Sequence, residues 1–126
     1  MTGETILVVE DEGLIALHLT EILEKAGYRV LDPVYSGEMA IRALEKSPAP
    51  DLILMDIGLS GTLDGIETAQ QIRQRLSVPL IFVTAYASES VLARMREVAP
   101  DGVIIKPFVD TELLDIVGKA LSRPAT

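Results

Sequence analysis

The chain contains no cysteine and no tryptophan, and only 4% of its 126 residues are aromatic. Without cysteine, neither disulfides nor thiolate metal sites can form. The core must instead be built mostly from Leu, Ile, Val and Ala, because 48% of the residues are hydrophobic. No apolar run approaches the roughly 20 residues of a membrane span, and the first residues lack the basic segment of a signal peptide. We therefore expect a cytoplasmic protein without a membrane anchor.

Positive charge is also scarce, since 11 Lys and Arg face 19 Asp and Glu and the formal net charge is -8. That balance argues against a surface that binds nucleic acid or anionic lipid directly. Acidic side chains that crowd together need a cation to relieve their repulsion. The length suits one domain with one sizeable core. We expect a single domain over residues 1–126, with about 5–122 ordered and short tails.

Apolar stretches of strand type alternate with stretches of helical periodicity along the chain. Strands are predicted over 5–9, 28–31, 51–56, 80–84 and 103–106, and helices over 14–26, 36–46, 64–76, 88–98 and 110–121. Five strand–helix units at this spacing indicate parallel strands joined by right-handed crossovers. The sequence predicts a doubly wound α/β domain whose sheet has the order 2-1-3-4-5, with helices on both faces.

Each of four predicted strands leads into polar side chains at its carboxyl end. These are Glu10 and Asp11 after the first, Asp56 after the third, Thr84 after the fourth and Lys106 after the fifth. In the predicted order these strands are neighbours, so the five side chains should share one crevice. Three carboxylates together suit an octahedral Mg²⁺ ion, and a hydroxyl and an ammonium beside it suit a phosphoryl oxyanion.

Each of these residues has an ordinary interpretation when it is taken alone. Asp56 can simply begin a loop, and Glu10 and Asp11 can form a solvated cap on the first helix. Thr84 is a common strand residue, and Lys106 can be a surface amine. The combination at one sheet edge favours a functional site over five separate coincidences.

At the level of motifs, the chain resembles the receiver domains of two-component response regulators, the CheY-like branch of the flavodoxin-like fold. The resemblance covers essentially the whole chain. The matching segments are 8–12 (VVEDE), 54–56 (LMD), 63–67 (LDGIE), 83–85 (VTA) and 105–108 (IKPF). This resemblance implies a signalling switch and not a classical enzyme, because the chain would catalyse only the transfer and loss of its own phosphoryl group.

By this resemblance, Asp56 accepts a phosphoryl group from a sensor histidine kinase or a histidine phosphotransfer protein. Mg²⁺ is the implied cofactor. Asp11 is expected to bind it directly and Glu10 to assist, with Asp56 and the backbone carbonyl of Gly58 completing the protein ligands. In-line phosphoryl transfer depends mostly on positioning and charge neutralisation, which such a site supplies.

The resemblance also assigns the switch. Thr84 and Lys106 would contact the phosphoryl oxygens, the small Ala85 would leave the pocket open, and a cis peptide would precede Pro107. Inward movement of Thr84 would shift the loop that follows it. We therefore expect the surface of the fourth helix, fifth strand and fifth helix to bind a downstream target or a second copy.

Two positions depart from the usual pattern of this family. Val103 stands where the fifth strand usually carries an aromatic residue that swings with the threonine, and Gly58 stands where many members have a polar side chain. We expect Tyr86 to take over the aromatic role and, together with Gly58, to slow self-dephosphorylation. Alternatively, Tyr86 is only a loop aromatic. His18, the only histidine, is predicted to be a surface residue away from the crevice.

Other functional classes compete with this interpretation. A receiver-like interaction module that works without phosphorylation is the main alternative. A haloacid dehalogenase-type hydrolase is disfavoured because Gly58 replaces the second Asp that such enzymes place two residues after the nucleophile. A flavodoxin-type flavin binder is disfavoured because the first strand leads into acids. The cognate kinase, the stimulus, the target, and whether the chain is whole or a fragment stay open.

Overall fold

The computed structural model describes residues 3–46, 48–85 and 88–122, in which strands and helices alternate as predicted. The elements are β1 (Thr5–Val9), α1 (Gly13–Lys25), β2 (Arg29–Val30), α2 (Gly37–Lys46), β3 (Leu52–Asp56), α3 (Gly65–Arg73), β4 (Leu80–Thr84), α4 (Glu89–Val98), β5 (Gly102–Ile105) and α5 (Asp110–Ser122). None of the helices in these ranges has both the length and the apolar character needed to cross a membrane.

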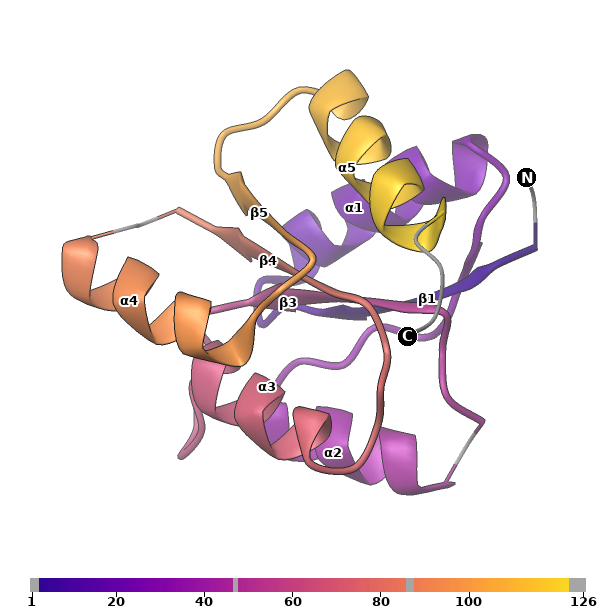
Figure 1. Cartoon of the computed structure of the whole chain (residues 1–126). Coiled ribbons are helices and arrows are strands. Elements are labelled where there is room, and N and C mark those ends of the chain that lie inside the picture. Colours follow the sequence, from indigo (N-terminus) through magenta and orange to yellow (C-terminus); the bar gives the residue numbers. More distant parts are fainter. Residues whose placement is uncertain (1–2, 47, 86–87, 123–126) are drawn as a thin grey trace.

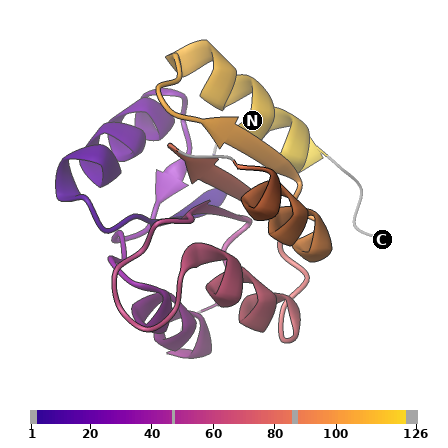
Figure 2. The same cartoon turned by 90° about the vertical axis from the view of Figure 1, so that its left-hand side faces the viewer.

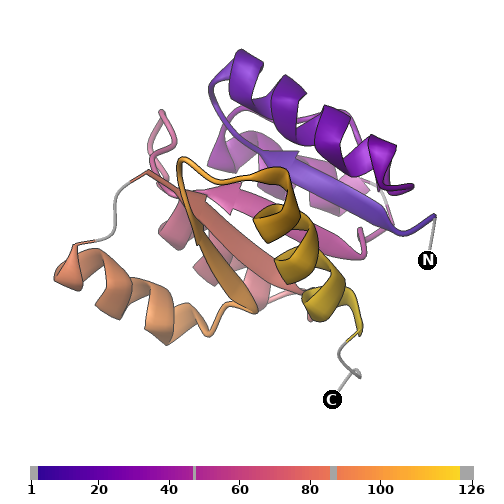
Figure 3. The same cartoon turned by 90° about the horizontal axis from the view of Figure 1, so that it is seen from above.

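The strands form one parallel sheet in the order β2-β1-β3-β4-β5, which confirms the predicted topology. Figure 1 and Figure 3 show the strands side by side with their carboxyl ends toward one edge. The register pairs Val9 with Met55, Asp56 with Val83, and Thr84 with Ile105. This register brings the carboxyl ends of the strands together at one edge of the sheet.

Helices cover both faces of the sheet, α1 and α5 on one and α2, α3 and α4 on the other (Figure 1, Figure 2). Because side chains alternate along a strand, Ile6 and Val8 pack toward the α1–α5 layer, whereas Leu7 and Val9 pack toward the other layer. Every residue of β3 and β4 is buried. These two strands form the rigid centre on which the site is placed.

The second strand is shorter than predicted, with two residues in place of the expected 28–31. Leu31 still donates to the Ile6 carbonyl at 3.0 Å, and Val34 donates to the Val8 carbonyl at 3.1 Å. Pro33 lies between them and has no N–H to donate, so the ladder with β1 is interrupted and resumes as a single bridge at Val34.

The starts of α3 and α4 are set by local side-chain hydrogen bonds. Asp64 and Glu67 form a capping box at the start of α3, and the Ser88 hydroxyl caps α4. Several other boundaries differ from the predicted ones by a single residue, and one differs by more. The third helix ends at Arg73 and not near 76, where the chain tightens into a turn.

Gly65 marks the tightest contact between α3 and the strand that carries Asp56. Its N–H donates to the Ile57 carbonyl at 2.9 Å. A methyl group at Gly65 would lie 1.9 Å from the carbonyl oxygen of Asp56 and 2.7 Å from the Ile57 Cα. Because both obstacles are backbone atoms, they cannot rotate away.

We therefore predict that Gly65→Ala lowers the free energy of unfolding by about 1–3 kcal/mol, as overpacking does elsewhere. Gly118→Ala is the matched control, because a methyl group there meets nothing within 4 Å. That substitution in α5 should raise stability by up to about 1 kcal/mol through helix propensity. Urea denaturation measures both, and equal effects would show that α3 can move away from Asp56.

Candidate functional site

Four strands deliver the predicted site residues to one edge of the sheet. Glu10 and Asp11 directly follow β1, while Asp56 and Thr84 are the last residues of β3 and β4. Lys106 directly follows β5, and its backbone N–H donates to the Thr84 carbonyl at 2.8 Å. All five lie where parallel strands place ligand sites, beyond their carboxyl ends.

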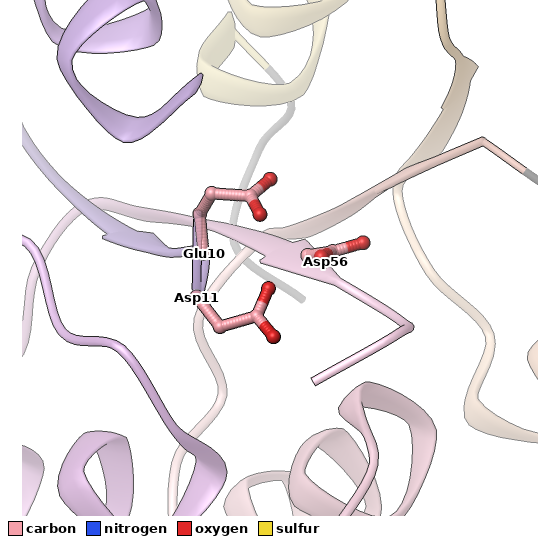
Figure 4. A group of neighbouring side chains, drawn as sticks. All are labelled: Glu10, Asp11 and Asp56. Carbon is pink, nitrogen blue, oxygen red and sulfur yellow. The ribbon is translucent and has the colours of Figure 1, made fainter. Parts of the chain in front are cut away.

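The three carboxylates form a compact cluster, in which Glu10, Asp11 and Asp56 each have an oxygen within 4.8 Å of the others. Figure 4 shows the side chains converging from the ends of two neighbouring strands. Glu10 is only 1% exposed and Asp56 only 7% exposed, whereas Asp11 is half-buried. The burial of Glu10 argues against its interpretation as a solvated helix cap, because the carboxylate of such a cap would face water.

Lys106 is the cation of the cluster. Its Nζ donates to Glu10 Oε1 at 2.9 Å and lies 3.7 Å from Asp56 Oδ1. The lysine side chain is only 14% exposed, so it is not the surface amine of the ordinary interpretation. Within the described residues, this ammonium pairs with Glu10 and Asp56, while Asp11 adds a third carboxylate, so negative charge is in excess and the site favours a further cation.

Burial and charge together shift the pKa of Glu10. The pKa is raised from 4.5 to about 7, mainly because burial removes the carboxylate from water, and the negative charge of Asp56 contributes in the same direction. The hydrogen bond from Lys106 and the one from the Glu12 N–H oppose this rise. Glu10 therefore exchanges a proton near neutral pH unless a cation holds it ionised.

Backbone amides of the loop between β3 and α3 hold two of the carboxylates. The Gly58 N–H donates to Asp56 Oδ1 at 3.3 Å, and the Ser60 N–H donates to Asp11 Oδ2 at 3.2 Å. These contacts could not be predicted from the sequence, because every residue except proline carries the same amide donor. The hard oxygen ligands and their fixed orientation suit a divalent cation such as Mg²⁺.

The predicted switch residues lie around the end of β4. Thr84 is 3% exposed and Ala85 is exposed. Val103 is half-buried on β5 and packs against the core layer of α2, α3 and α4. The peptide bond between Lys106 and Pro107 is cis. Tyr86, the expected substitute for the missing aromatic, lies outside the described residues.

His18 lies on the exposed side of α1, as predicted, and takes no part in the carboxylate cluster. Its ring stacks on Phe108, with ring centroids 6.5 Å apart and planes 10° apart. Phe108 follows the lysine of the site by two residues, so the histidine has a packing role beside the loop that leads to α5.

The titration of Glu10 predicts a pH-dependent stability. Between about pH 4.5 and 7 the folded chain holds a proton that the unfolded chain has released, so stability rises as pH falls through this window. Without divalent cations, the wild type should lose stability relative to Glu10→Gln as pH is raised from about 5 to about 8.

Urea denaturation at several pH values, with a chelator present, measures this difference. Glu12→Gln is the matched control, because Glu12 is an exposed neighbour outside the cluster. It should follow the wild type. Parallel curves for wild type and Glu10→Gln would mean that Glu10 is ionised throughout the range.

Comparison with known proteins identifies the family of the chain. The family model described as the response regulator receiver domain matches residues 6–118. The chain is 30% identical over 118 residues to the transcriptional regulatory protein PdtaR of Mycobacterium tuberculosis, covering 94% of this chain and 57% of that protein. It is 41% identical over 127 residues to ResD of Bacillus subtilis, covering 99% and 51%. The chain thus spans about half the length of these relatives.

Solved structures give the same answer. The N-terminal domain of a response regulator/sensory box/GGDEF protein from Carboxydothermus hydrogenoformans is 37% identical, with a TM-score of 0.86 over 94% of each chain. A CheY-like response regulator receiver domain protein from Methanospirillum hungatei is 27% identical, with a TM-score of 0.86 over 95% of this chain and 94% of that one. The chain therefore belongs to the response regulator receiver domain family.

Proposed function

We propose that this chain is the phospho-accepting receiver of a cytoplasmic two-component phosphorelay, with Asp56 as the acceptor. The observation that carries the proposal is the arrangement around Asp56. A nearly buried carboxylate ends a central strand, with two further carboxylates within 4.8 Å and the Lys106 ammonium 3.7 Å away. The donor would be a sensor histidine kinase or a histidine phosphotransfer protein.

The proposed reaction is an in-line transfer between two side chains. An oxygen of Asp56 attacks the phosphorus of the phosphohistidine, and the P–N bond breaks with its electron pair returning to the imidazole nitrogen. Asp56 becomes an acyl phosphate. Oδ1 accepts the Gly58 N–H at 3.3 Å and lies 3.7 Å from Lys106 Nζ, so this oxygen is already engaged. Oδ2 is therefore the proposed nucleophile.

Glu10, Asp11, Asp56 and the backbone carbonyl of Gly58 would hold Mg²⁺, which supplies charge neutralisation for the phosphoryl oxygens. The cluster fits such an ion, because its donors are oxygens and its carboxylates are short of positive charge. Lys106 would add a second positive charge, since its Nζ already lies between Glu10 and Asp56. The Thr84 hydroxyl would hydrogen-bond the new dianion. The same groups would serve the chain's own dephosphorylation.

The proposed output is a shift of the surface formed by α4, β5 and α5. Thr84 ends β4, and the chain runs from it through a short loop into α4. In this structure, a guanidinium nitrogen of Arg94 on α4 donates to Asp64 Oδ2 at 2.9 Å and connects α4 to the start of α3. Val103 cannot swing as an aromatic ring would. A downstream target or a second copy would bind this surface, on which Ile105 is 46% exposed.

Incubation with Mg²⁺ and acetyl phosphate tests the acceptor. Intact-mass analysis should show one added phosphoryl group on the wild type and none on Asp56→Asn, while circular dichroism shows both folded. Asp32→Asn is the matched control, because Asp32 is an exposed aspartate that follows β2 and lies outside the cluster. It should be labelled like the wild type.

Labelling of Asp56→Asn at another aspartate would reject the acceptor assignment. An absence of labelling and of any beryllofluoride adduct on the wild type would favour the alternative, a receiver-like module that binds partners without phosphorylation.

The metal assignment is tested by thermal unfolding. A ligand that binds only the folded state raises the melting temperature with its concentration, by an amount set by RT ln(1 + [L]/Kd). Mg²⁺ should raise the melting temperature of the wild type and of Glu12→Ala, which removes an equal charge one residue away. Asp11→Ala should lose most of the response. A full response in Asp11→Ala would place the ion elsewhere.

A further inference from the structure

The loop between β3 and α3 carries the amide groups that hold the site carboxylates. Gly58 binds Asp56 and Ser60 binds Asp11, but both loop residues are exposed. Leu59, 8% exposed, anchors the middle of the loop in the core. Beyond it, residues 60–62 are exposed, so burial does not fix the part of the loop that reaches Asp11.

That outer part of the loop is held by Glu38, from the first turn of α2. Glu38 Oε2 accepts the Thr62 N–H at 3.1 Å and also accepts the Thr62 hydroxyl. These hydrogen bonds keep the pKa of Glu38 below its usual value, so the carboxylate stays ionised at neutral pH. The two residues are 24 positions apart, so this is a contact between separate elements.

Gly61 allows this close approach. Its φ of +102° lies in the region that favours glycine, and a methyl group there would come within 3.1 Å of Glu38 Oε1. Oε1 is itself buried, and within the described residues it has no hydrogen-bond partner. The backbone of the loop at Gly61 is therefore in close contact with the Glu38 carboxylate.

The start of α2 is a fixed platform for this contact. The Ser36 hydroxyl accepts the Met39 N–H at 3.1 Å and caps the helix. Gly37 is buried, and a methyl group there would overlap the Thr68 hydroxyl of α3 at 2.0 Å. The close packing of α2 on α3 holds Glu38 in place. Through its hydrogen bonds to Thr62, Glu38 in turn holds the loop between β3 and α3.

We propose that Glu38 is a positioning residue for the metal site. By clamping Thr62, Glu38 keeps the Ser60 N–H on Asp11 and so orients the Asp11 carboxylate toward Glu10 and Asp56. Partners that hydrogen-bond a metal ligand from outside orient it, and their loss commonly weakens metal binding. This inference rests on the proposed function, because it concerns the ion that would assist transfer to Asp56.

Isothermal titration calorimetry with Mg²⁺ tests the clamp. Glu38→Ala should weaken Mg²⁺ binding about tenfold. Glu38→Gln keeps an acceptor oxygen without the charge and should stay close to the wild type. Thr62→Val removes the exposed hydroxyl from the other partner and should weaken binding in the same direction. In Glu38→Ala, Thr62→Val should add little further loss, because the two residues act through one contact.

Amide hydrogen exchange of the metal-free protein gives a second measurement that does not depend on the ion. In Glu38→Ala, the Ser60 and Thr62 amides should exchange about tenfold faster, as expected for loss of a charge-assisted hydrogen bond. Core amides of β3 should be unchanged. Glu45→Ala is the matched control, because it removes a carboxylate from the other end of α2 that pairs with Arg75. It should alter neither Mg²⁺ binding nor loop exchange.

The outcomes separate this inference from the proposed function. Wild-type Mg²⁺ affinity in Glu38→Ala would overturn the clamp alone. Equal weakening of Mg²⁺ binding in Glu38→Ala and Glu38→Gln would show that Glu38 acts only through its charge, and this would also overturn the positioning role. If the wild type bound no Mg²⁺, the metal assignment of the proposed function would fail and the inference with it, whatever the exchange rates.

Discussion

The structure depends on one electrostatic constraint, the burial of acidic side chains at the carboxyl edge of the sheet beside a single lysine. Removing a carboxylate such as Glu10 from water is costly unless a partner stabilises it. The Lys106 ammonium at 2.9 Å is that partner, but it also faces Asp56 at 3.7 Å and cannot neutralise both. The pKa of Glu10 is raised mainly by burial and further by the negative charge of Asp56, which shows that Lys106 does not fully compensate the carboxylate. A cation would relieve the imbalance, and that requirement links the apolar architecture to the proposed chemistry.

The sheet places these charges accurately because its centre is rigid. Both faces of β3 are covered by helices, and all five of its residues are buried, so Asp56 ends a strand that has little freedom to shift. Neighbouring strands fix Glu10 and Lys106 in the same way through the ladder of backbone hydrogen bonds. The loops add finer control. Amides of the loop between β3 and α3 orient the Asp56 and Asp11 carboxylates, and the contact of Glu38 with Thr62 extends that control to α2.

Most of the fold could be predicted from the sequence, because strand and helix periodicities agree with the turn and cap residues along the chain. Acids at the ends of strands were sufficient to predict the carboxylate cluster, since parallel strands bring their carboxyl ends together. The pairing of Lys106 with Glu10 could not be predicted, because it depends on side-chain conformation and on the depth of burial. The hydrogen bond from the Ser60 N–H to Asp11 could not be predicted either, because a backbone donor has no sequence signature. The interruption of the β1–β2 ladder at Pro33 could have been predicted, since proline has no N–H to donate to a neighbouring strand.

The element proposed to move has few buried side chains. Among the described residues of α4, only Met95 and Val98 are buried, as few as in α2, whereas α1 buries four residues and α3 five. The ion pair of Arg94 with Asp64 connects α4 to α3, but the two side chains are 43% and 32% exposed. Such a pair contributes about 0–1 kcal/mol, little more than thermal energy. A ligand shifts a two-state equilibrium only by its difference in affinity for the two states. Hydrogen bonds from Thr84 to a phosphoryl dianion on Asp56 would therefore compete with this weak ion pair and with the packing of Met95 and Val98, and not with an extensively buried helix.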